Sequence, residues 1–313
     1  MSFYTSVHAN YDSILLRGVN SRGKRFAEKV PYKPTVYLPS EKNSKFKTIK
    51  GQNVKPMTFN SMMEARGFIK KYKDVEGFNI YGSTNFQYTF IHENYPGLIK
   101  YDPALINVLS FDIEVISDKG FPYADQAIHE VVAISMRMRD KMVVLGCQPY
   151  TVKSDNVQYI LCKNEEELLE NFLKVWKECD PDIVTGWNIS GFDIPYMVNR
   201  LERVLGDGAS KRLSPWGLVE TRQVFIRGKE QNFYFPVGVA VLDYLELFRK
   251  FTFKEHESYK LDYIAFQELG DRKIDYSEYV NITGLLSGKF DVDINEDTSK
   301  SAVRTKGKLR TAI

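Results

Sequence analysis

The stretch VLSFDIEVIS, residues 108–117, reads as a buried β-strand, yet it carries two carboxylates, those of Asp112 and Glu114. Successive strand residues point to opposite faces, so residues two apart share one face. Two anionic groups held side by side among Val, Leu, Phe and Ile repel each other and lose hydration. A cation between the carboxylates, Arg or Lys partners over them, or an exposed edge strand would each make the pair tolerable. Because apolar residues flank the pair on both sides, we rank the metal site above the edge strand.

The composition is that of a soluble globular chain long enough for two domains. Of the 313 residues, 43% are hydrophobic and 27% are charged, and the net charge of +3 does not by itself indicate nucleic-acid binding. There is no apolar run of about 18 residues and no signal-peptide pattern, so we expect no membrane association. Cys147, Cys162 and Cys179 form no Cys-x-x-Cys pair, which fits a reducing cytoplasm, and four scattered histidines predict no zinc site.

Residues 1–103 are expected to form a smaller, β-rich amino-terminal domain. Short strand-like runs, FYTSV, SILLRGV, KRFAEKV and TVYLP, precede an amphipathic helix at 61–75. Residues 41–55 between them hold five lysines and a single acid; a solvated loop is the first interpretation and a phosphate-facing patch the alternative. The Pro- and Gly-containing connector at 94–106 places a domain boundary near residue 103.

Residues 104–286 alternate strands and helices, which predicts an α/β domain. β-rich runs follow FDIEV, and a helix is expected at 164–181, with Asn164 as its cap and Glu167 at the capping-box position. A second helix at 194–206 and an extended hairpin at 222–243 come next. Residues 287–313 form a basic tail without apolar periodicity, which we expect to be disordered.

The second informative stretch is TGWNISGFDIPY, residues 185–196. Asp193 stands directly before the second helix, where an N-cap is the ordinary interpretation. Trp187 and Asn188 lie between a buried strand and that helix, and loops at this place in open α/β sheets carry function. Phosphodiester hydrolysis by two Mg²⁺ ions about 4 Å apart needs carboxylate oxygens. Asp112 and Glu114 on one strand face, with Asp193 at a nearby helix start, could supply them.

Taken together, these motifs resemble the proofreading exonuclease domain of family-B DNA polymerases, in particular the replicative polymerases of large T-even-type tailed phages. The resemblance runs to about residue 280 and is carried by these stretches: FDIEV, TGWNISGFDIPYMVNR, SPWG, VLDYLELFRKFTF and KLDYIAFQELG. It implies a ribonuclease-H-like α/β exonuclease domain beside the amino-terminal domain. It also implies that Asp112, Glu114 and Asp193 bind two Mg²⁺ or Mn²⁺ ions and that a 3′-terminal nucleotide is removed from single-stranded DNA.

The resemblance implies two DNA-binding residues as well. Asn188 matches a residue near the substrate, and Phe121 matches an aromatic residue that wedges against bases at a melted primer end. Plain packing is an equal interpretation of Phe121, because base stacking on aromatic side chains tolerates many sequences. The hairpin at 222–243 matches a family element that helps to separate primer from template.

The chain departs from the family at the third exonuclease motif, a Tyr and Asn shortly before an Asp. Near the expected place it reads FDVDINEDTSKSAV, in which Asp291, Asp293 and Asp297 lack the matching Tyr. We therefore expect weak or absent hydrolysis by this chain alone. The polymerase motifs are also missing from the sequence, which suggests a frameshifted, split or intron-interrupted gene.

The expected partners are the 3′ end of primer–template DNA, the remaining polymerase chain if the enzyme is split, and replisome proteins such as a sliding clamp. The expected location is the cytoplasm of an infected bacterial host. The alternative function is that of a catalytically inactive fragment that binds DNA ends or acts as a scaffold with a second polymerase chain.

Overall fold

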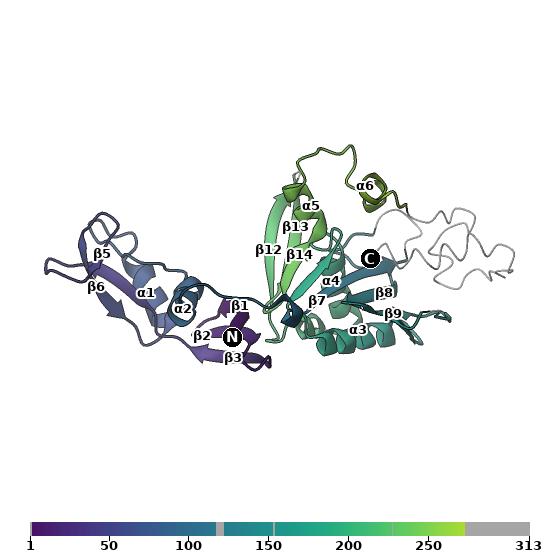
Figure 1. Ribbon diagram of the computed structural model, residues 1–313, viewed down its shortest axis with the longest axis horizontal. Coiled ribbons are helices and arrows are strands. Elements are labelled where there is room, and N and C mark those ends of the chain that lie inside the picture. Colours follow the sequence, from purple (N-terminus) through teal and green to yellow (C-terminus); the bar gives the residue numbers. More distant parts are fainter. Residues whose placement is uncertain (1, 117–121, 153, 227, 273–313) are drawn as a thin grey trace. The chain divides into compact units, whose positions relative to one another are not determined.

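The structure is a computed structural model that describes residues 2–116, 122–152, 154–226 and 228–272 (Figure 1). The chain divides into two compact units, Met1–Leu105 and Ile106–Ile313. Of the sequence predictions, Phe121, the candidate third-motif acids and the basic tail lie outside the described residues.

The first unit holds two small antiparallel sheets and two helices. One sheet has the order β1-β2-β3, and the other has the order β4-β6-β5. The strands and helices are β1 (Phe3–Ala9), β2 (Ser13–Val19), β3 (Arg25–Pro31), β4 (Thr35–Pro39), β5 (Phe46–Lys47), β6 (Asn53–Thr58), α1 (Met62–Tyr72) and α2 (Phe86–Asn94). The strand-like runs and the helix that the sequence predicts are all present. Within 41–55 the five lysines are exposed, and part of the stretch pairs as β5 and β6 instead of forming an open loop.

Local capping explains where α1 begins. Ser61 precedes the helix and its hydroxyl accepts a hydrogen bond from the Glu64 N–H at 3.1 Å. Met62 and Ala65 are buried and join the core of this unit with residues of both sheets and of α2. The apolar stripe of α1 therefore holds it against the first unit, as amphipathic helices require.

The second unit is built on a six-stranded mixed sheet with the order β10-β9-β8-β7-β11-β14. Pairs β7–β8 and β8–β9 are antiparallel, whereas β9–β10, β7–β11 and β11–β14 are parallel. The strands are β7 (Val108–Val115), β8 (Val131–Met138), β9 (Lys141–Gly146), β10 (Val157–Leu161), β11 (Ile183–Gly186) and β14 (Ala240–Asp243). The predicted α/β class is confirmed, although the sequence reasoning missed β10.

Besides the sheet, the described part of this unit holds four α-helices, a short 3₁₀ helix and one ribbon: α3 (Glu165–Cys179), α4 (Asp193–Leu205), α5 (Tyr244–Phe251), α6 (Leu261–Leu269), η2 (Ala209–Leu213), and β12 (Val219–Ile226) paired with β13 (Lys229–Pro236). The ribbon confirms the predicted hairpin as far as Pro236, whereas residues 240–243, which the prediction included in it, form β14 of the main sheet. The predicted cap of α3 is also present, because Asn164 accepts from the Glu167 N–H at 3.0 Å; Glu167 reaches back one residue further than in a capping box and accepts from the Lys163 N–H at 2.8 Å.

The main core lies between the sheet and α3 and α4. Leu109, Phe111 and Ile113 of β7 are buried in it, and the Phe111 ring lies 6.0 Å from Phe172 and 5.9 Å from Trp176 of α3. The alternate residues of β7 consequently face the other side of the sheet, where residues of α5 and α6 line a cavity. This alternation positions the site.

A buried ion pair joins the two core helices. Arg200 of α4 donates to Glu165 of α3 at 2.7 and 2.5 Å, and to the carbonyl oxygens of Ala127 and Ile128 at 3.1 and 3.0 Å. Because both charged side chains are almost fully buried, each depends on the other for compensation.

Candidate functional site

Asp112 and Glu114 lie on the face of β7 that is turned away from α3 and α4. Both are partly exposed, while their neighbours Phe111 and Ile113 are buried in the core. The sheet places β7 between β8 and β11, so β7 is not an edge strand of the sheet. However, β11 pairs only with Val108, Leu109 and Ser110, so the carboxylate-bearing half of β7 extends beyond its partner on that side.

Asp193 fills that side of β7. Its carboxylate accepts a hydrogen bond from the Ile113 N–H at 3.2 Å, and the residue is only 4% exposed. The ordinary interpretation of Asp193 as an N-cap is wrong, because Phe192 occupies the N-cap position and Asp193 is the first residue of α4. The side chain accepts hydrogen bonds from the backbone of β7 and from its own backbone N–H at the start of α4.

Burial and the neighbouring carboxylate of Asp112 dominate the electrostatics of Asp193. Burial raises the pKa of this carboxyl well above its usual range, and the neighbouring Asp112 carboxylate raises it further, whereas the hydrogen bond from Ile113 lowers it. Asp243 adds a smaller repulsion. A pair of carboxylates in this position would be stabilised by a cation.

The carboxylates of Asp112, Glu114 and Asp193 are suitable ligands for divalent ions, but the structure shows only part of the arrangement that a metal site needs. Carboxylate oxygens are the ligands of Mg²⁺, and the fold brings Asp112 and Asp193 together from β7 and α4. Glu114 follows on the same face of β7. Among the described residues, no group of three or more His, Cys, Asp or Glu side chains is close enough to hold a metal ion. The structure thus brings Asp112 and Asp193 together, and it places Glu114 on the same face of β7 as Asp112.

A loop of six residues, 187–192, carries the chain from β11 to α4, and Asp243 holds it in place. The Asp243 carboxylate accepts hydrogen bonds from the N–H groups of Asn188 at 3.0 Å, Ser190 at 2.9 Å and Leu245 at 2.9 Å. Asp243 is buried at the end of β14, beside Gly186 of β11. It therefore fixes the approach to Asp193 and also caps α5.

The sequence reasoning missed Asp243. The available signal was an acid at the end of the strand-like run VLD, directly before a helix. The loop residues that donate hydrogen bonds to its carboxylate, however, lie more than fifty residues earlier in the sequence. Only the parallel pairing of β11 with β14 brings them together.

Asn188 adopts a left-handed backbone conformation with φ of 62° at the start of this loop. Its carbonyl oxygen accepts from the N–H groups of Gly191 and Phe192, each at 3.0 Å. A Cβ on Gly191 would lie 2.7 Å from the Asn188 Oδ1, so a larger residue there would require the Asn188 side chain to move. These contacts give Asn188 a structural role in shaping the loop; its contact with DNA remains a prediction.

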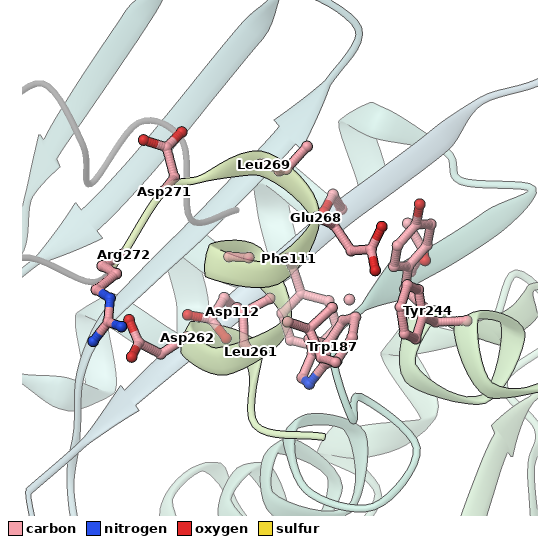
Figure 2. A pocket seen from close by; sticks show the side chains of 16 residues that line it. Phe111, Asp112, Trp187, Tyr244, Leu261, Asp262, Glu268, Leu269, Asp271 and Arg272 are labelled. Carbon is pink, nitrogen blue, oxygen red and sulfur yellow. The ribbon is translucent and has the colours of Figure 1, made fainter. Parts of the chain in front are cut away.

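A cavity of about 450 Å³ opens beside Asp112 (Figure 2). Trp187, Tyr244 and Phe248 form an aromatic wall, with Trp187 ring centroids 6.2 Å from Tyr244 and 5.8 Å from Phe248. The Trp187 Nε1–H donates to the carbonyl oxygen of Tyr259 at 3.2 Å, which fixes the ring. Leu261 of α6 lines the opposite side.

The rim of this cavity is acidic. Asp112, Asp262, Glu268 and Asp271 line it together with a single cation among its lining residues, Arg272. The aromatic wall of this cavity can accept a flat apolar group by stacking. The carboxylates at its rim can accept a polar group that is bound through a cation.

Comparison with known proteins gives a consistent match. A family model described as "DNA polymerase family B, exonuclease domain" matches residues 63–264. The match includes β7, the loop at 187–192, α4, the ribbon, β14 and α5.

Relatives with curated names cover most of the chain. A "DNA-directed DNA polymerase" of Enterobacteria phage T4 is 32% identical over 307 residues, which cover 89% of this chain and 34% of the relative. A "DNA-directed DNA polymerase" of Escherichia phage RB69 is 33% identical over 303 residues, which cover 88% of this chain and 33% of the relative. A "DNA polymerase delta catalytic subunit" of Bos taurus is 30% identical over 206 residues, 59% of this chain and 18% of the relative. The chain spans about a third of the length of the two phage relatives.

None of the helices in the described part of the chain is long and apolar enough to cross a membrane.

Proposed function

The chain belongs to the family-B DNA polymerases through their ribonuclease-H-like exonuclease domain, and from this premise we propose that it removes nucleotides from the 3′ end of single-stranded DNA. The resemblance seen in the motifs is confirmed by the family match and by the phage relatives. The observation that carries the proposal is the buried Asp193 carboxylate beside Asp112 at the edge of β7.

We assign the binding of two Mg²⁺ or Mn²⁺ ions to Asp112, Glu114 and Asp193. When bound, such ions activate a water molecule and neutralise the charge that develops on the scissile phosphate. Asp193 would hold its oxygens in place through the Ile113 N–H, and Asp112 would share its charge with the same ions. Glu114, on the same face of β7 as Asp112, would complete the set by a small change in its side chain or in β7.

The terminal nucleotide would enter the cavity beside Asp112. The aromatic wall of Trp187 and Tyr244 offers surfaces on which a base can stack, and it excludes water from one side of the phosphate. Asn188 and Phe121 remain candidates for contact with the DNA end. The proposed setting is DNA replication in the cytoplasm of an infected bacterial cell, with the remaining polymerase chain and a sliding clamp as candidate partners.

The test is hydrolysis of a 5′-labelled single-stranded oligonucleotide in Mn²⁺ or Mg²⁺, with products resolved by length. We expect slow shortening from the 3′ end, because the third motif is not matched in this sequence. Asp112→Ala and the isosteric Asp193→Asn should each reduce the rate by on the order of a hundredfold, as loss of a group that stabilises transition-state charge does. Asp155→Ala changes an exposed acid outside the site and is the control. Shortening at equal rates in all four chains would refute the assignment.

A second function, a non-catalytic module that binds DNA ends, is favoured by one observation. The part of the chain that the structure describes does not gather three metal-ligating side chains. Titration with Mn²⁺ separates the two functions. Saturable binding that Asp112→Ala abolishes supports the nuclease, whereas binding of single-stranded DNA without any Mn²⁺ binding supports the module.

A further inference from the structure

Two cysteines that are distant in sequence lie opposite each other at the end of the sheet. Strands β9 and β10 are parallel, with Leu161 in register with Gly146. The Cys162 N–H donates to the Gly146 carbonyl oxygen at 2.9 Å, which closes the last pair of the ladder, and Cys147 and Cys162 are the next residues of the two chain segments. In a parallel ladder this bond places Cys162 opposite Cys147, the residue after Gly146.

The two side chains also lie at the same core cluster. Leu145 and Ile160 are register partners and both belong to the main core cluster. Cys147 and Cys162 follow them by two residues, directly after the ends of the two strands; Cys162 belongs to the same core cluster, Cys147 packs against it, and the Cys162 charge acts on Cys147. Neighbouring strands lie about 4.8 Å apart, a Cα separation within the range of about 4.4 to 6.8 Å found for disulfides.

The two thiols differ in access. Cys147 is partly exposed, whereas Cys162 is 1% exposed and its sulfur lies 3.6 Å from the Asn171 amide nitrogen of α3. A soluble oxidant can therefore reach Cys147 first, and Cys162 can act only on a neighbour.

The surroundings make the first step slow near neutral pH. Burial raises the pKa of Cys147 to about 11, and the charges of Cys162, Glu165, Glu130 and Glu167 add to the rise. Burial also raises the pKa of Cys162. The thiolate is the attacking species, so the rate should increase about tenfold per pH unit up to about pH 11.

We propose that Cys147 and Cys162 form a disulfide site that a small-molecule disulfide, such as oxidised glutathione, converts reversibly. The Cys147 thiolate attacks one sulfur of the oxidant, which forms a mixed disulfide and releases one glutathione thiolate. The Cys162 thiolate then attacks the Cys147 sulfur, which forms the protein disulfide and releases the second glutathione. Two protein thiols are oxidised and one glutathione disulfide is reduced to two thiols.

The bond would fasten β10, the edge strand, to β9 and close the intervening loop. A disulfide that closes a loop of about 15 residues stabilises the folded state. For a unit of this size, that stabilisation raises the melting temperature by roughly 6 to 12 °C. The disulfide would also stiffen the start of α3, where Glu165 pairs with Arg200. This inference is independent of the proposed nuclease activity.

The experiment treats the whole chain with oxidised glutathione at pH 8.5, blocks remaining thiols with iodoacetamide, and measures intact and peptide masses. We expect the loss of two hydrogens, a peptide pair linked through Cys147 and Cys162, one alkylated Cys179, and full reversal by dithiothreitol. Cys179→Ser is the matched control and should still form the bond.

Two results would overturn the proposal. One is stable glutathione on Cys147 with an alkylated Cys162, and the other is a linkage that includes Cys179. Cys147→Ser is the variant that removes the disulfide, because Cys147 is partly exposed, whereas Cys162→Ser changes a buried core residue. Cys147→Ser should leave Cys162 reduced and show no gain in melting temperature on oxidation.

Discussion

Replacing Asp243 with alanine removes the acceptor of three hydrogen bonds, two that hold the loop before Asp193 and one that caps α5. The bonds measure 3.0, 2.9 and 2.9 Å and involve the N–H groups of Asn188, Ser190 and Leu245. A hydrogen bond to a charged group contributes about 1.5 to 3 kcal/mol net, so at the lower end of this range the loss of the two loop bonds amounts to about 3 to 4 kcal/mol. Opening of the loop should therefore become about 10² to 10³ times more frequent.

Amide hydrogen exchange measures this directly at the three donors. In Asp243→Ala, exchange at Asn188, Ser190 and Leu245 should accelerate by the factor above, and Mn²⁺ affinity should fall because Asp193 is no longer held. Asp243→Asn keeps one oxygen acceptor but turns an amide donor toward one N–H group. It should therefore accelerate exchange mainly at Ser190, by about tenfold.

Asp182→Ala is the control, because Asp182 is also buried and accepts the Asn107 N–H at 2.9 Å at the opposite end of β11. It should destabilise the unit without changing Mn²⁺ affinity. The reasoning about Asp243 is refuted if exchange at Asn188 and Ser190 is unchanged in a folded Asp243→Ala chain. It is also refuted if Asp182→Ala lowers Mn²⁺ affinity as much as Asp243→Ala does.

Three further predictions, with four substitutions, test the scaffold. Arg200→Ala should cost about 3 to 5 kcal/mol in urea unfolding because it leaves the Glu165 charge buried, whereas Arg212→Ala, which removes a largely exposed pair, should cost about 1 kcal/mol or less. Burial raises the pKa of Glu202, but hydrogen bonds from Ser210 and Gly208 outweigh it and the net shift is downward. The stability that Glu202 adds relative to Glu202→Gln should then be present at pH 7 and be lost on acidification below about pH 4.3. Gly67→Ala lies within α1 with open space around its Cβ, and it should stabilise the first unit by about 0.5 to 1 kcal/mol.

Each of these has a contradicting result. Equal costs for Arg200→Ala and Arg212→Ala would mean that the buried pair is compensated by water. A wild-type advantage over Glu202→Gln that grows as the pH falls would reverse the sign of the linkage. A loss of stability in Gly67→Ala would show that the helix surface is covered by another part of the protein.

Local patterns in the sequence predicted much of the fold, because the physics behind them is local. Alternation along 108–115 gave the two faces of β7, and Asn164 with Glu167 gave the start of α3. Apolar periodicity gave α1 and α4 to within a few residues. The short VQYIL segment of β10 was missed, because its pairing with β9 is specified by tertiary contacts and not by a local signal.

The site was predicted less completely, since it depends on which segments meet. The motifs identified Asp112, Glu114 and Asp193, but a helix-start acid reads as an N-cap until the strand that it caps is known. Asp243 bonds to residues more than fifty positions away, and Cys147 meets Cys162 only through the register of two parallel strands. No property of those residues alone reveals such partners.

The central claim, that Asp112 and Asp193 face each other to hold divalent ions, is tested most directly by anomalous diffraction from crystals soaked in MnCl₂. The account predicts an anomalous peak within coordination distance of both carboxylates that is absent from Asp112→Ala crystals. An intact fold with ordered Asp112 and Asp193 side chains and no manganese between them would contradict it.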